Sequence, residues 1–176
     1  MRIAIVVGHS FEDGGAVRCV DGVQEHAWNT DLAEMIAAHD PKNIKIFHRK
    51  GSLPYKREIE EVYARVDAWG CDLSIEPHFN AGGGTGTETF SSGSKGSLKA
   101  AAKVHAAIVK TLGLKDRGVK IRNATVKGRG YESLVSGKAP ALLLEPYFGD
   151  NAGDCAVADN NKKALAAAIY LAAVGC

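Results

Sequence analysis

Residues 3–9 read IAIVVGH, a run of five apolar residues that ends in glycine and histidine. Short apolar runs bounded by glycine, proline or charged residues are typical of buried strands. Similar runs occupy residues 44–47, 73–75 and 141–144, and residues 85–92 predict a further strand entered through a glycine-rich turn. The chain therefore contains at least five expected strands.

Between these strands, apolar residues recur at the three- and four-residue spacing of an amphipathic helix. Glycines just past the second and third patterns predict that those helices end at Gly70 and Gly113. Alternating strands and helices favour an α/β fold with a twisted, mostly parallel or mixed sheet and helices on both faces. No repeat or linker divides the chain, so we expect residues 1–176 to form a single domain. The four expected helices lie at residues 28–36, 59–69, 98–112 and about 161–171.

Composition excludes several classes of protein. The formal net charge is only +2, so nothing global favours nucleic acid or an anionic membrane surface. The apolar C-terminal stretch 164–176 is shorter than the roughly 20 residues that cross a bilayer. The first residues lack the pattern of a secretory signal, and the four cysteines are widely scattered. We therefore expect a protein that is made in the cytoplasm with reduced thiols, with no nucleic-acid partner and no membrane span.

Ionisable side chains follow three of the expected strands. His9 follows the first run, His78 comes shortly after the run 73–75, and Glu145 directly follows 141–144. In open α/β sheets the binding crevice lies outside the carboxyl ends of the strands. We therefore expect these three side chains to meet at one edge of the sheet, although a single histidine in such a place is more often structural.

Two histidines and one glutamate are an established ligand set for catalytic zinc. Glu25 opens the first helical pattern beside the loop that follows His9, so it is the expected third ligand. His26 is its competitor, but adjacent helical residues point about 100° apart, which argues against both binding the same ion. This reasoning predicts one Zn²⁺ ion held by His9, Glu25 and His78. Glu145 then serves as general base to the water and general acid to the departing amine.

The order of short motifs along nearly the whole chain resembles the zinc-dependent N-acetylmuramoyl-L-alanine amidases of the amidase-3 group, found in cell-wall hydrolases and phage endolysins. The matching residues are 7–9, 13–16, Gly22, Glu25, Arg49, Arg57, 71–73, 78–81, 86–90, 117–120, 140–145 and 149–151.

The resemblance implies zinc on His9, Glu25 and His78, with Glu145 as the catalytic carboxylate. It also implies cleavage of the amide between N-acetylmuramic acid and the first L-alanine of the peptidoglycan stem peptide. The family commonly has Ser-Ile-His before the second histidine ligand, whereas this chain has Glu76-Pro77-His78. Glu76 either accepts a hydrogen bond from the ligating imidazole or points away from the site.

Substrate contacts are expected from two places. Residues 115–129 carry six basic side chains and one acid, Asp116. This segment either binds carboxylates of the stem peptide or anionic wall polymers, with Arg117 as the best single candidate, or is a solvated loop. Asn80 either orients the substrate or stabilises the turn after the strand.

Exported members of the family carry a signal sequence and often a wall-binding module, neither of which the chain displays. The chain is thus similar to a phage or prophage endolysin that reaches the wall through a lysis pore, or to the catalytic part of a longer protein. We expect a monomer acting on bacterial peptidoglycan. Two alternatives remain open: a zinc peptidase that cuts within the stem peptide, and a non-catalytic peptidoglycan-binding module.

Overall fold

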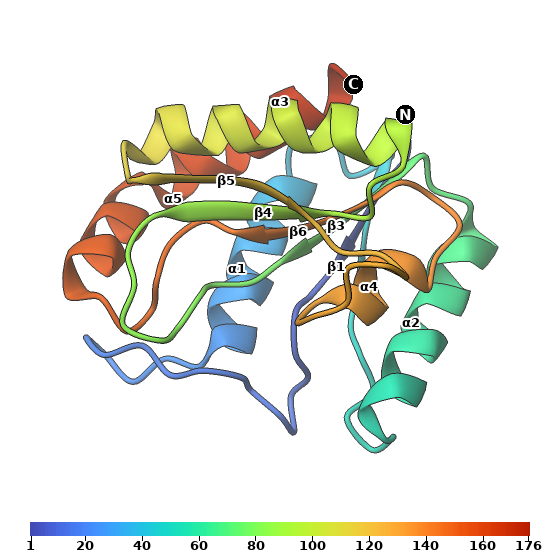
Figure 1. Cartoon of the computed structure of the whole chain (residues 1–176), viewed down its shortest axis with the longest axis horizontal. Coiled ribbons are helices and arrows are strands. Elements are labelled where there is room, and N and C mark those ends of the chain that lie inside the picture. The colour runs from blue at the N-terminus through green and yellow to red at the C-terminus, as the bar shows by residue number, and fades with distance from the viewer.

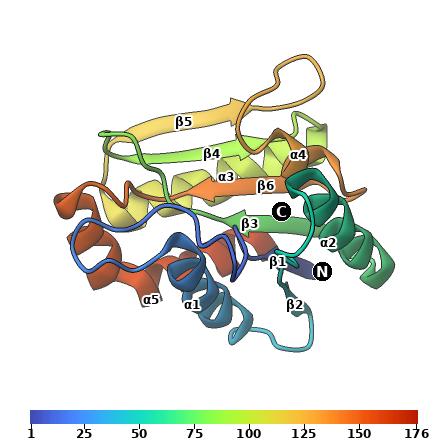
Figure 2. The ribbon, with the colours of Figure 1, turned by 90° about the horizontal axis from the view of Figure 1, so that it is seen from below.

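A computed structural model describes residues 1–176. The chain folds around a central six-stranded sheet. The strand order across the sheet is β2-β1-β3-β6-β4-β5, and Figure 2 shows the strands side by side in this order. The strands are β1 (Ile3–Val6), β2 (Ile44–Phe47), β3 (Leu73–Pro77), β4 (Thr87–Ser91), β5 (Asp116–Ile121) and β6 (Ala141–Glu145).

The sheet is mixed, as the sequence predicts. β1 pairs in parallel with both β2 and β3, β3 pairs in parallel with β6, and β4 pairs in parallel with β5. β4 runs antiparallel to β6 and reverses the direction of the sheet there. The first four strands in the order, β2-β1-β3-β6, therefore place their carboxyl ends along one edge.

Helices cover both faces of the sheet, which confirms the predicted α/β class. Alternate strand residues such as Ile5, Ile75 and Leu144 form one large core with α1, α3 and α5, and Figure 1 shows α3 and α5 lying along that side. On the other face, α2 packs on β1 and β2, and α4 packs on β4 and β6. The helices are α1 (Glu25–Ala37), α2 (Tyr55–Trp69), α3 (Lys95–Leu112), α4 (Tyr131–Val135) and α5 (Ala152–Val174).

The structure corrects the expected elements in three places. β5 and α4 were not expected from the sequence, and α5 begins at Ala152 rather than near residue 161. Asn151 caps α5 by accepting a hydrogen bond from the Asp154 amide, so the polar first turns of the helix are stabilised without an apolar pattern. Gly70 and Gly113 end α2 and α3 in the left-handed conformation, as predicted. None of the helices has the combination of length and apolarity that a bilayer crossing requires.

The connections that leave β1 and β3 diverge. The chain passes from β1 through α1 to β2 on one side, and from β3 toward β4 on the other. Such a divergence between neighbouring parallel strands opens a crevice at their carboxyl ends. His9 and His78 follow these two strands, so the topology alone brings them to one place.

Candidate metal centre and active site

His9, Glu25 and His78 converge at this crevice. His9 follows β1, Glu25 is the first residue of α1, and His78 follows β3. One ligand atom from each residue lies within 4.8 Å of the others. Glu25 stands between the imidazoles, with Oε1 2.7 Å from Nδ1 of His78 and Oε2 3.2 Å from Nε2 of His9. The structure thus brings together the three residues that the sequence nominated as ligands.

The backbone around His9 is built for close approach. His9 is the only residue other than glycine with a positive φ, 66°, which is uncommon for a side chain of this kind. A Cβ on Gly8 would lie 2.5 Å from the Pro77 carbonyl oxygen, and one on Gly15 would lie 2.6 Å from the His9 ring. Glycine at both positions therefore allows the first loop to press His9 against His78, whose ring centroids are 5.1 Å apart.

Glu25 is buried and ionised. Its Oε1 accepts a hydrogen bond from the Phe79 amide at 3.1 Å, and its Oε2 accepts one from the Ala16 amide at 3.3 Å. Burial alone would raise the pKa of Glu25, but the hydrogen bonds from His78 and His9 outweigh it and hold the pKa well below its ordinary range. Glu25 is therefore a carboxylate fixed in place with both oxygens directed at the candidate ligands.

The two ring nitrogens of His78 face two different carboxylates. Nδ1 faces Glu25, and Nε2 lies 2.8 Å from Oε1 of Glu76. Burial lowers the pKa of His78, but the contacts with Glu25 and Glu76 outweigh it and raise the pKa to about 9. The carboxylates of Glu25 and Glu76 therefore favour a positive charge at the position of His78. The contact also decides between the two orientations considered for Glu76, which turns toward the imidazole.

Glu145 faces the same crevice from the end of β6. Its side chain is 5% exposed, and its Oε2 has no hydrogen-bond partner. Burial raises the pKa of Glu145 to about 7, although the charges of His78 and Arg129 act in the opposite direction. A buried carboxyl group with a free oxygen and a pKa near neutrality is suited to exchange protons.

These side chains line one cavity with a volume of about 180 Å³. Its wall combines the candidate ligands and Glu145 with cationic and aromatic side chains from the loops around the crevice. Its polar lining residues include His9, Glu25, Arg49, Tyr55, Glu76, His78, Arg129, Ser133 and Glu145.

A family model described as N-acetylmuramoyl-L-alanine amidase, Amidase_3, matches residues 3–174. The chain belongs to the Amidase_3 family. The curated amidase CwlM of Bacillus licheniformis is 28% identical over 159 residues, which cover 88% of this chain and 59% of CwlM. The sporulation-specific amidase of Bacillus subtilis strain 168 is 27% identical over 159 residues, covering 88% of this chain and 58% of that protein. The chain thus spans less than two thirds of the length of these relatives.

Solved structures of the family share the fold. The catalytic domain of the CD27L endolysin, which targets Clostridia Difficile, is 27% identical, with a TM-score of 0.82, and the match covers 99% of this chain and 97% of that domain. An amidase from Clostridium difficile 630 is 20% identical, with a TM-score of 0.80, and the match covers 99% and 95% of the two chains. The six-stranded sheet described above is therefore an Amidase_3 fold.

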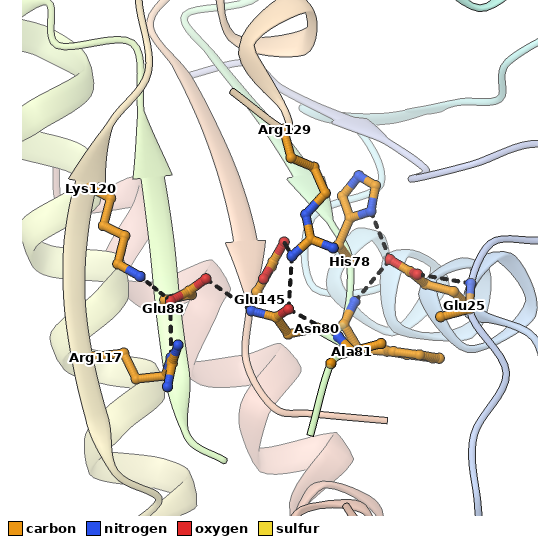
Figure 3. Close-up of polar contacts among 12 residues, drawn as sticks. Glu25, His78, Asn80, Ala81, Glu88, Arg117, Lys120, Arg129 and Glu145 are labelled. Carbon is orange, nitrogen blue, oxygen red and sulfur yellow. Dashed lines mark hydrogen bonds and ion pairs between the residues drawn. The ribbon is translucent and has the colours of Figure 1, made fainter. Parts of the chain in front are cut away.

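Within this Amidase_3 domain, the two expected substrate contacts lie beside the cavity rather than among its lining residues. Arg117 donates from Nε to Oε2 of Glu88 at 3.0 Å, and Lys120 pairs with the same oxygen. Asn80 donates from Nδ2 to Oε1 of Glu88 at 2.9 Å. Figure 3 shows Glu88 at the centre of this group, on the far side of Glu145 from Glu25.

Arg129 is the cationic residue of the basic segment that reaches the cavity. It lies between β5 and α4, its side chain is 68% exposed, and its Nη2 is 3.9 Å from Oε1 of Glu145. Arg129 is one of the six basic residues of segment 115–129, and no sequence pattern distinguishes it from the other five. Its position at the cavity depends on the course of a loop. Figure 3 shows its guanidinium between Glu145 and His78.

The other histidines belong to different surroundings. The ring of His26 faces that of His48 at 6.0 Å, so the competitor of Glu25 lies outside the cluster. His105 is buried, contacts Thr89 at 3.1 Å and pairs with Asp116 at 2.8 Å. It is a packed, hydrogen-bonded histidine away from the candidate metal centre.

Proposed function

We propose that the chain hydrolyses the amide bond between N-acetylmuramic acid and the L-alanine of the peptidoglycan stem peptide, using one zinc ion held by His9, Glu25 and His78. The observation that carries the proposal is the position of Glu145, whose unpartnered carboxyl oxygen is buried at the same cavity as the three candidate ligands. Family membership supplies the bond to be cut.

The residues fit zinc in number and kind. Two imidazole nitrogens and a carboxylate oxygen match a frequent catalytic set that leaves one position open. Their ligand atoms lie within 4.8 Å of one another, so these three residues would together hold one ion. Glu76 opposite Nε2 of His78 supplies the carboxylate that ligating histidines usually contact with their other nitrogen.

Bound zinc would polarise the amide carbonyl and lower the pKa of water at the open position. Glu145 takes a proton from the attacking water and gives it to the amide nitrogen as the C–N bond breaks. The hydroxyl group remains on the lactyl carbonyl carbon, and L-alanine leaves with a free amine. The positive charge of Arg129 favours the ionised form of Glu145 that begins this sequence.

Arg129 holds the substrate beside Glu145. One side of its guanidinium is bonded to Oδ1 of Asn80 at 2.9 Å, which leaves further N–H groups free at the edge of the cavity. A guanidinium pairs well with carboxylates, and the stem peptide is rich in them. Asn80 and Glu88 then act through Arg129, while Arg117 and Lys120 balance the charge of Glu88.

The similarity to the CD27L endolysin domain supports a lytic role on the bacterial wall. The proposal includes delivery to the wall through a lysis pore, with peptidoglycan as the macromolecular partner and a monomer as the active form.

The decisive experiment incubates the purified chain with peptidoglycan, without a chelator, with a chelator, and with zinc restored, and identifies the released ends by mass spectrometry. We expect zinc-dependent release of peptides that begin with a free L-alanine amine, and none from Glu145→Gln. Zinc-dependent cuts within the peptide would instead make the chain a peptidase. Binding to peptidoglycan without any cut would make it a binding module.

A further inference from the structure

Glu76 is the acid at which this chain departs from the usual motif of its family, and it is completely buried. Its exposed fraction is 0%, and it lies on β3, two residues before His78. An isolated carboxylate in such a place is very costly, so the groups around it must compensate for its desolvation.

Four side chains from four segments bond to Glu76. Tyr63 of α2 donates its hydroxyl to Oε2 at 2.9 Å, and Ser133 of α4 donates to Oε1 at 3.1 Å. Arg49, from the loop after β2, forms a buried ion pair with Oε1, which also contacts Nε2 of His78 at 2.8 Å. These elements form the α2–α4 side of the sheet, so the orientation of Glu76 is set by the packing of that whole layer.

In this arrangement Glu76 accepts hydrogen bonds and does not donate any. The guanidinium of Arg49 keeps its charge and can only donate, and the hydroxyl groups of Tyr63 and Ser133 also donate, so the buried oxygens of Glu76 are ionised acceptors. An ionised carboxylate has no proton to give, so Nε2 of His78 must be the donor across the 2.8 Å contact. Arg49 offsets the charge of Glu76, so the carboxylate is present without adding net negative charge.

We propose that Glu76, clamped by Arg49, Tyr63 and Ser133, is a positioning residue that keeps a proton on Nε2 of His78, so that Nδ1, which faces Glu25, is the nitrogen that gives up its proton to bind the metal. The inference rests on the proposed zinc site. It assigns to Glu76 the task that a backbone carbonyl or an outer carboxylate performs for other ligating histidines.

The clamp also gives a role to the hydroxyl groups of Tyr63 and Ser133. Tyr63→Phe or Ser133→Ala would keep most of the packing but would each remove one of the hydrogen bonds that Glu76 accepts. Glu58 of α2 is a second buried acid close to the charge of Arg49. Its Oε1 has no hydrogen-bond partner, and it contacts neither His9 nor His78. It therefore offers a matched comparison for Glu76.

The first test needs no substitution. Nitrogen-15 NMR of the imidazoles in the zinc-loaded chain reports which nitrogen of His78 carries the proton. We expect a protonated Nε2 with a hydrogen-bonded proton signal and a metal-bound Nδ1. A protonated Nδ1, or zinc on Nε2, would overturn the assignment even if the chain is an active zinc amidase.

The second test measures zinc affinity by competition with a chromophoric chelator in the wild-type chain, Glu76→Gln and the control Glu58→Gln. We expect affinity to fall roughly 10- to 100-fold in Glu76→Gln and to stay unchanged in Glu58→Gln. Equal affinity in all three would remove the role of Glu76 and leave the amidase proposal standing, whereas no zinc binding by the wild type would remove both. If Glu76→Gln fails to fold, Tyr63→Phe serves in its place, with a smaller loss of affinity expected and an unchanged affinity counting against the clamp.

Discussion

Arg129 donates a hydrogen bond from Nη2 to Oδ1 of Asn80 over 2.9 Å. Asn80 is buried and is itself held by Glu88, so a loop arginine is anchored to the sheet while most of its side chain stays exposed. The anchoring keeps a cation beside Glu145 without burying it. The position of Arg129 at the cavity therefore depends on Asn80 and Glu88, which do not themselves line the cavity.

Arg129→Ala tests this relationship. The loss of one charge-assisted contact, worth about 1.5–3 kcal/mol, should lower kcat/KM roughly 10- to 100-fold, mostly through KM. Zinc affinity and the melting temperature should change little, because the side chain is 68% exposed and is not a candidate ligand. Arg57→Ala is the control, since Arg57 is 76% exposed and does not line the cavity. An unchanged kcat/KM in Arg129→Ala would show that the guanidinium does not contact the substrate.

Glu145→Gln separates proton transfer from metal binding. The amide keeps the shape of the side chain, and Oε2 of Glu145 has no hydrogen-bond partner to lose, so the fold should persist. Turnover should drop by about 10²- to 10⁴-fold, the range for a lost general acid–base group. Zinc content, measured by atomic absorption, should equal that of the wild type. If zinc were lost from the variant, Glu145 would be a ligand rather than the proton carrier.

Metal binding should appear in the stability of the chain. A ligand that binds only the folded state stabilises it by RT ln(1 + [L]/Kd), about 2.7 kcal/mol at a hundredfold excess over Kd. The melting temperature of the metal-free chain should therefore rise as zinc is added, and Glu25→Gln should abolish the rise. Calorimetry with and without zinc measures both. Magnesium is the control ion, because it prefers oxygen ligands and octahedral geometry.

The core of the fold was predictable because its central strands β1, β3 and β6 are buried along their whole length. The apolar runs of β1 and β6 stand out from the amphipathic helices, whereas β2 contains the exposed Lys45 and β3 contains polar residues. β5 has no such pattern: it is an edge strand with charged residues at both Asp116 and Arg117, and its side chains are only partly buried. The five-residue helix α4 is too short to show a period. Both elements depend on neighbours far away in the sequence.

The site divides in the same way. His9 and His78 follow strands and Glu145 ends one. Because binding crevices lie at the carboxyl ends of parallel strands, the sequence alone predicts that the three residues lie close together. Arg129 and Arg49 lie on loops, whose course is not encoded by any local period. In the sequence, Glu88 is one polar residue within an expected strand. Its position beside the cavity follows from its antiparallel pairing with Glu145, which the sequence does not reveal.

The ion-pair group around Glu88 gives a pH dependence with a definite sign. Burial raises the pKa of Glu88, but hydrogen bonds from Lys120 and Arg117 outweigh it and lower the pKa below its ordinary value. A carboxylate with a depressed folded-state pKa stabilises the fold above the unfolded pKa, about 4.3, and this contribution is lost as pH falls through the folded value. The difference in unfolding free energy between the wild type and Glu88→Gln should therefore be constant above about pH 5.5 and shrink below about pH 4. Urea denaturation from pH 3 to 7 in the presence of a chelator measures it, and Glu34→Gln, which removes an exposed carboxyl group, is the control for the loss of one surface acid. A difference that grew on acidification would mean that the carboxylate of Glu88 destabilises the fold and that Arg117 and Lys120 fail to compensate its burial.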